Sequence, residues 1–152
     1  MTTSLWWPHT LHEVSARASK GEQAFDPALR EFLDHFYSNP TEREASLHAQ
    51  PIPLDDLRDA YLGATAEHLA RRYDLDVPAW AETYGLALRR PFFAGGLESL
   101  KALLTVESPT AFRRRMLFVS KNALDRPRMF LEEQDRQAAL EQIGRASCRE
   151  RV

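Results

Sequence analysis

Apolar residues recur along this chain at spacings of three and four, which is the pattern of amphipathic α-helices. The clearest run is "FDPALREFLDHFY", whose apolar positions share one helical face: Phe25, Leu29, Phe32, Leu33 and Phe36. Asp26 is expected to cap this helix, with Pro27 at its first position. Asn39-Pro40 should end it, because proline disfavours helical backbone at the preceding residue.

The same spacing predicts helices over residues 10–21, 41–49, 54–73, 97–107 and 109–123, and a short helix or turn around Trp80. Thr10 with Glu13, and Thr41 with Glu44, match the capping-box pattern at a helix start. The longest of these helices should bury one broad face: Leu54, Leu57, Tyr61, Leu62, Thr65 and Leu69. Its Glu67 is expected to lie mostly away from that face. The last helix should bury Phe112, Met116, Val119 and Ala123 and stop before Pro127.

The chain contains neither a run of alternating apolar and polar residues nor an internal repeat. The pattern therefore predicts an all-α fold, a single compact domain of about six or seven helices over residues 1–128. Residues 129–142 are helix-prone but weakly amphipathic, and we expect a truncated C-terminal extension there.

The final segment, "IGRASCRERV", holds the only cysteine, Cys148, beside three arginines. Nearby positive charge would favour a thiolate. However, residues 143–152 resemble the translation of a sequencing-library adapter, so we interpret them as a non-native tail and set them aside. Without this tail the net charge is −4 rather than −2, and neither a disulfide nor a thiol mechanism remains.

Charge is unevenly distributed along the chain. Residues 1–88 carry seven basic and fourteen acidic side chains, whereas residues 89–128 carry nine basic and three acidic ones. Such asymmetry indicates either an acidic partner or internal pairing of the two halves. No apolar run is long enough to span a bilayer, and "SLWWPH" is too short for a signal peptide. We therefore expect a cytoplasmic protein.

Three stretches resemble a known family: "FDPALREFLDHFYSNPTERE", "DAYLGATAEHLARRYDLDVPAWA" and "PFFAGGLESLKALLTVESPTAFRRRMLFVSKNAL". The chain is similar over residues 21–128 to a family of small, uncharacterised, all-helical bacterial proteins. Its members are sometimes labelled helix-turn-helix or antitoxin-like. The resemblance implies a partner-binding protein encoded beside a toxin-like or nucleotidyltransferase-like gene, and it supplies no catalytic residues.

The conspicuous basic cluster is Arg113, Arg114 and Arg115. Consecutive helical residues point about 100° apart, so these three cannot form one stripe. Arginine suits bidentate contacts to carboxylates or phosphates. The cluster therefore indicates either a partner or phosphate contact or, as we favour, pairing with acidic helices through residues such as Asp55, Asp56 or Asp59.

Other candidate sites are weaker. "PFFAGGLESL" lacks the glycine spacing of phosphate-binding loops, so Phe92 and Phe93 are expected to close the core or to form a small aromatic patch. His68 falls on the apolar face of the long helix and is expected to be a core histidine. We predict no catalytic, cofactor-binding or metal-binding residue, and no cofactor.

The leading hypothesis is a non-enzymatic, helical, protein-binding module, antitoxin-like or accessory to the product of an adjacent gene. Its partner-binding residues would be Arg89, Arg90, Phe92, Phe93, Arg113, Arg114, Arg115, Lys121 and Asn122. The alternative is a DNA-binding regulator with a helix-turn-helix around residues 97–123, whose second helix would enter the major groove.

Overall fold

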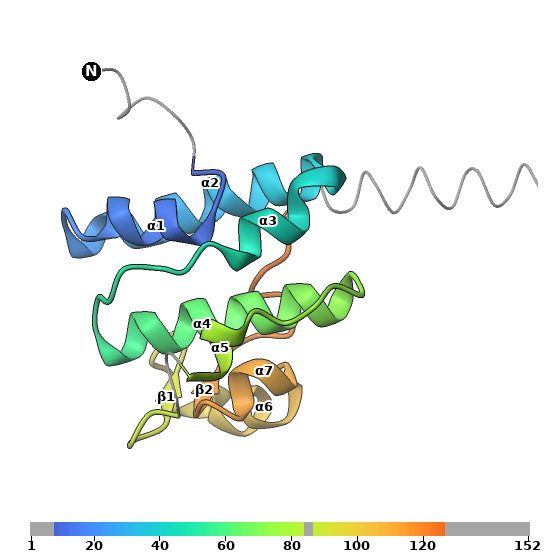
Figure 1. Ribbon diagram of the computed structural model, residues 1–152. Coiled ribbons are helices and arrows are strands. Elements are labelled where there is room, and N and C mark those ends of the chain that lie inside the picture. Colours follow the sequence, from blue (N-terminus) through green and yellow to red (C-terminus); the bar gives the residue numbers. More distant parts are fainter. Residues whose placement is uncertain (1–7, 84–86, 127–152) are drawn as a thin grey trace, which may run out of the picture.

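The computed structural model describes residues 8–83 and 87–126, and within them the fold is predominantly α-helical, as predicted (Figure 1). The α-helices are α1 (Leu11–Ala18), α2 (Phe25–Ser38), α3 (Arg43–His48), α4 (Asp56–Arg72), α5 (Ala79–Thr83), α6 (Lys101–Glu107) and α7 (Thr110–Arg113). Trp6 and Trp7, the predicted extension at 129–142, Cys148 and the tail at 143–152 lie outside the described residues.

Helices α1, α2 and α3 form one layer, at the top of Figure 1. The apolar face predicted for α2 is buried as expected, from Phe25 to Phe36. Arg43 of α3 is also buried, and its guanidinium donates to the carbonyl oxygens of Phe36 at 3.0 Å and Tyr37 at 3.1 Å. Because the last carbonyls of a helix lack intrahelical donors, Arg43 supplies the partners that the end of α2 needs.

Helix α4 crosses the middle of the molecule, between this layer and the elements below it (Figure 1). It is buried on more than one face, through small residues that include Ala60, Gly63, Ala64, Ala66 and Ala70. Small side chains let neighbouring elements approach the helix from both sides. The expectation that Glu67 lies away from the buried face is wrong, because α4 has a second buried face and Glu67 is only 1% exposed.

Below α4 lies what we call the C-terminal lobe, residues 87–122. It contains β1 (Phe92–Phe93), the 3-10 turn η4 (Glu98–Leu100), α6, α7 and β2 (Leu117–Phe118). The strands are parallel, with Phe92 opposite Leu117 and Phe93 opposite Phe118. The sequence pattern did not predict these strands, because two-residue strands are too short to show alternation.

The helix predicted over residues 109–123 is wrong beyond Arg113. Met116 has a φ of +63°, which is incompatible with a continuing right-handed helix. The following residues are extended and pair with β1. Phe112 and Val119 are nevertheless buried, as predicted, although they reach the core from a short helix and from the end of a strand.

The helix caps follow the sequence pattern only in part. Thr10 caps α1 as predicted, accepting a bond from the amide of Glu13 at 3.2 Å. Asp26 and Thr41 do not act as caps, because α2 begins one residue before Asp26, and α3 follows a 3-10 turn at Pro40–Glu42. Asp55 caps α4 and accepts from the Arg58 amide at 2.8 Å.

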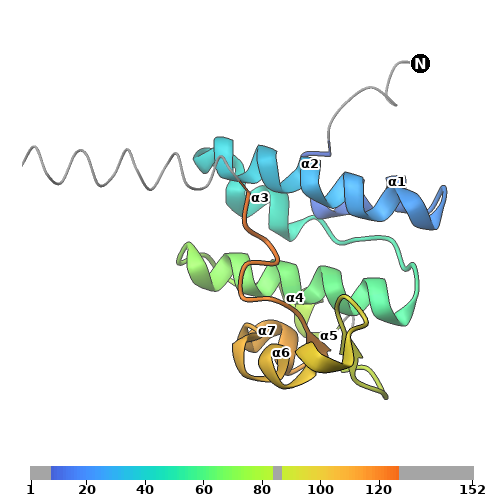
Figure 2. The same cartoon turned by 180° about the vertical axis from the view of Figure 1, so that it is seen from behind.

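After β2 the chain passes α4 and returns to the upper layer (Figure 2). There the hydroxyl of Tyr37 donates to the carbonyl oxygen of Leu124 at 2.7 Å. Arg126 forms a bidentate pair with Asp34, at 2.9 and 3.1 Å. The two layers are therefore joined both through α4 and through this returning segment.

Candidate functional site

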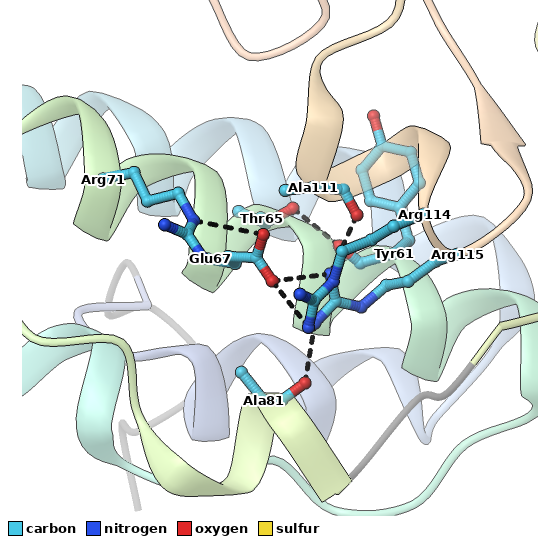
Figure 3. Close-up of polar contacts among 8 residues, drawn as sticks. All are labelled: Tyr61, Thr65, Glu67, Arg71, Ala81, Ala111, Arg114 and Arg115. Carbon is cyan, nitrogen blue, oxygen red and sulfur yellow. Dashed lines mark hydrogen bonds and ion pairs between the residues drawn. The ribbon is translucent and has the colours of Figure 1, made fainter.

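The arginine triplet is divided between the interior and the surface. Arg114 and Arg115 converge with Arg71 on the carboxylate of Glu67, and we call these four residues the arginine cluster (Figure 3). The distances to the Glu67 oxygens are 3.0 Å from Arg114, 3.1 Å from Arg115 and 3.3 Å from Arg71. Internal pairing, the interpretation favoured from the sequence, is therefore confirmed for two of the three arginines, but its carboxylate is Glu67 rather than Asp55, Asp56 or Asp59.

Arg115 is buried, with 3% exposure, so its prediction as a partner contact is wrong. Its guanidinium also donates to the carbonyl oxygens of Ala111 at 2.8 Å and Ala81 at 2.7 Å. Burial lowers the pKa of Arg115, and the charge of Glu67 opposes that shift. The group fastens α7 and α5 to α4, because these three bonds lead to all three helices.

The remaining predicted partner-binding residues lie in the C-terminal lobe. Arg89, Arg90, Arg113, Lys121 and Asn122 are exposed. Within the described part of the chain, none of the four cations forms an ion pair. These four are therefore available for an external anionic group.

The aromatic pair "FF" has a divided role. Phe93 stacks on Phe118 with ring centroids 4.8 Å apart, and the ammonium of Lys101 lies 5.2 Å from its centroid. Phe92, on the other face of the strand, is 36% exposed. The expectation that both phenylalanines close the core is wrong, because neither belongs to the apolar core, and Phe93 instead packs on Phe118 within the lobe.

An exposed apolar row on α6 and its leading turn was missed from the sequence. It consists of Leu97, Leu100, Leu103 and Val106, which are 57%, 37%, 54% and 76% exposed, and we call it the α6 ridge. Of the α6 residues, Leu104 alone is buried. Six large apolar side chains are exposed among the described residues, and five of them lie between Phe92 and Val106. Sequence reasoning missed the ridge because periodicity cannot tell which apolar residues find a neighbour.

Helix α6 lies at the side of the molecule farthest from α1 and α2 in both views (Figures 1 and 2). Helix α6 packs on β2, and Ser108, which directly follows α6, bonds to Val119 at the end of β2. The Ser108 hydroxyl oxygen accepts from the amide of Val119 at 2.8 Å. The ridge is consequently carried on an anchored element.

The helix-turn-helix expected around residues 97–123 has a short second helix. Helix α7 spans only Thr110–Arg113, and two of its residues, Ala111 and Phe112, are buried. A recognition helix must present several exposed side chains to base edges in the groove. This geometry weighs against the DNA-binding alternative.

The histidines do not form a metal centre, since the described part of the chain has no group of three or more histidine, cysteine or acidic side chains placed to hold an ion. His68 is half-buried near the ring of Phe112, and burial lowers its pKa. His9 and His35 stack with centroids 3.9 Å apart.

In the two described stretches, no helix combines the length and apolar character needed to cross a bilayer.

Comparisons of the chain with protein-family models, with curated proteins and with solved structures found no match in any of the three. The α6 ridge and the unpaired cations of the lobe are therefore the features on which a functional interpretation rests.

Proposed function

We propose that this chain is a non-enzymatic, cytoplasmic, protein-binding module, and that its contact surface is the α6 ridge together with the exposed cations of the C-terminal lobe. The observation that carries this proposal is the concentration of exposed aliphatic side chains on α6 and the turn that leads into it. Clustered exposed apolar residues with a polar surround mark interaction sites in soluble proteins. An antitoxin-like or accessory role, with the product of an adjacent gene as the partner, follows from the family resemblance.

The arginine cluster supports a division between buried charges, which serve the interior, and exposed charges, which can contact a partner. Arg115 and Glu67 are buried, so their charges serve the interior. Arg89, Arg90 and Arg113 are exposed and lack a partner among the described residues. Exposed charges steer association and select partners, while apolar contacts at the centre of an interface supply most of the affinity.

The test is co-expression with the product of each adjacent gene, followed by purification of the complex. Leu103→Glu places a charge on the ridge and is expected to abolish a complex that the wild type forms. Ile52→Glu is the matched control, because Ile52 is 38% exposed but lies in the linker before α4. Equal complex formation by both variants, or none by the wild type, would contradict the proposal.

A further inference from the structure

We infer that the exposed edge of the arginine cluster is a binding site for a phosphate group, held by Arg71 and Arg114. The site shares no residue with the α6 ridge, so this inference goes beyond the proposed function and does not depend on it. Two observations carry it, namely the excess of positive charge around Glu67 and the guanidinium N–H groups that no described residue uses.

The arginine cluster holds more positive than negative charge. Arg71, Arg114 and Arg115 each place a guanidinium nitrogen within 3.3 Å of an oxygen of Glu67. One carboxylate balances one of these three charges and leaves an excess of two. Guanidinium groups gathered this closely repel one another, so a second anion at the cluster would be attracted to all three.

The residues around the cluster do not remove this excess. Glu82 of α5 adds one negative charge that acts on Arg115. In the lobe, the amide of Leu88 donates to the carbonyl oxygen of Arg115 at 3.0 Å, which brings the next two residues, Arg89 and Arg90, close to the cluster. Both are exposed, and neither forms an ion pair with a described residue. The local charge therefore remains positive.

The two outer arginines have hydrogen-bond donors to spare. Arg71 donates to Glu67 through Nε, and Arg114 contacts the same carboxylate through one terminal nitrogen. In the described part of the chain, neither guanidinium has a further hydrogen bond or ion pair. Their side chains are 62% and 45% exposed, whereas that of Glu67, which lies between them in Figure 3, is 1% exposed. The two arginines therefore cover the carboxylate while their remaining N–H groups stay open to solvent.

Phosphate is the anion that fits this edge. Arginine binds phosphate and carboxylate groups through two parallel N–H bonds. A phosphate monoester carries about two negative charges near neutral pH and three acceptor oxygens, which matches the excess charge and lets both guanidinium groups donate at once. A carboxylate brings a single charge. Since Arg71 and Arg114 contact different oxygens of Glu67, one phosphate group can bridge them.

The test is an NMR titration of the full, isotope-labelled chain with inorganic phosphate. Potassium chloride at equal ionic strength is the reference, because salt alone screens surface charge. We expect saturable shifts in the side-chain N–H signals of Arg71 and Arg114 with phosphate and none that saturate with chloride.

Variants of Arg71 locate the site. Arg71→Gln removes one phosphate ligand and leaves Arg114 and Arg115 on Glu67, so we expect the fold to persist and phosphate binding to weaken by about tenfold or more. Arg71→Lys keeps the charge without the planar fork and should restore only part of the binding. Arg30→Gln is the matched control, because Arg30 is an exposed arginine on α2, and it should bind phosphate as the wild type does. Circular dichroism checks that each variant is folded.

A phosphoserine peptide and its unphosphorylated form identify the source of the phosphate. Tighter binding of the phosphopeptide than of inorganic phosphate assigns the site to a phosphorylated protein, whereas equal or weaker binding assigns it to a small phosphate ester. Both results support the phosphate site. Binding of the phosphopeptide should weaken as pH falls from about 7.5 to about 5, because its phosphate loses one charge near pH 6.

The contrary results are equally specific. Phosphate shifts that do not saturate, or saturable binding that Arg71→Gln leaves intact, overturn the site. Tighter binding of acetate than of phosphate overturns the choice of ligand in favour of a carboxylate. Tighter binding of a single-stranded oligonucleotide without a terminal phosphate overturns it in favour of a phosphodiester, and equal binding of the two peptides overturns the recognition of phosphate.

Discussion

Glu67 is a buried charge surrounded by three opposite charges. Arg71 and Arg114 have side chains that are 62% and 45% exposed, so their remaining N–H groups reach water. Arg115 is only 3% exposed, and three of its N–H groups donate to Glu67, Ala111 and Ala81. In the described part of the chain, no buried side-chain nitrogen or oxygen lacks a partner. The arginine cluster is therefore satisfied only as a unit.

Replacing the carboxylate should reveal that dependence. In Glu67→Gln, the Arg115 charge stays buried without its counter-charge, and we expect the free energy of unfolding to fall by about 3–5 kcal/mol. Urea denaturation followed by circular dichroism measures the change. Glu44→Gln is the control, because Glu44 is exposed on α3, and it should change stability by less than about 0.5 kcal/mol. Similar effects of both substitutions would show that the buried pair is not needed.

Tyr61 gives stability a dependence on alkaline pH. Its ring packs edge-on against Phe25 and Phe112, and burial, with a smaller effect of the Asp26 charge, raises the pKa of its hydroxyl from 10.0 to about 12. Between these values the unfolded chain releases the proton while the folded chain holds it. The stabilisation present below about pH 10 is thus lost as pH rises towards 12, by about 1.4 kcal/mol per pH unit.

Tyr61→Phe removes this group and should reduce the alkaline loss. We expect the variant to gain on the wild type as pH rises from about 9 to about 11, by roughly 1–2 kcal/mol in unfolding free energy. Urea denaturation at each pH provides the comparison. Near pH 8 the Tyr61 hydroxyl is protonated in both the folded and the unfolded chain, so the difference between the variant and the wild type measured there is the baseline. A difference that stays constant across this range would mean that the Tyr61 pKa is not raised.

At the scale of elements, the end of α4 shows how a helix is terminated here. Asp74 follows the C-cap residue Tyr73 and has a φ of +56°. The amide of Leu75 then donates to the carbonyl oxygen of Ala70 at 2.7 Å. This is the bond pattern of a Schellman motif, in which glycine is the preferred residue at the position of Asp74. Aspartate also places a negative charge at the negative end of the helix dipole.

Asp74→Gly should therefore stabilise the fold by about 0.5–1 kcal/mol, since it removes both the backbone strain and the unfavourable charge. The midpoint of thermal unfolding measures this gain. Asp76→Gly makes the same chemical change two residues later, where φ is not positive. That control should be neutral or destabilising, because glycine adds freedom to the unfolded chain. A loss of stability in Asp74→Gly would contradict the argument.

Hydrophobic periodicity correctly predicted helices that bury a single face. It failed for a helix buried on two faces and for a segment that forms a strand. The apolar face of α2 is buried as the pattern indicated. The apolar run from Met116 to Val119 was assigned to a helix, because a short apolar run fits either a strand or a helix. The choice was made by pairing with Phe92 and Phe93, which lie more than twenty residues earlier in the chain.

The predicted site residues show the same limit of local sequence patterns. Arg89, Arg90 and Lys121 are exposed, as expected, because no acidic side chain of the described chain pairs with them. Arg115 was also expected at the surface, although Glu67 holds it inside. Glu67 lies 48 positions away from Arg115 in the sequence, so a local sequence pattern cannot reveal that the two side chains pair.

At the scale of the molecule, α4 unites the fold. The upper layer and α5 and α7 both pack on it, and one continuous apolar core runs from Leu11 to Leu124. Since neither layer can bury its apolar side without α4, the layers are expected to unfold together in a single transition. The outer face of α6 is excluded from that core, which leaves it free to contact another molecule.

The two ends of the described chain meet on neighbouring residues of α2. The ring of His9 stacks on His35, and Arg126 is bound to Asp34. The described chain therefore begins and ends at nearly the same place. The order in which its helices and strands are connected could change while their arrangement in space stays the same. A short linker from residue 126 to residue 8 would join these two ends, and new ends could be opened between Gly95 and Gly96, in an exposed turn. Such a circular permutant should keep the same core with a different first and last helix.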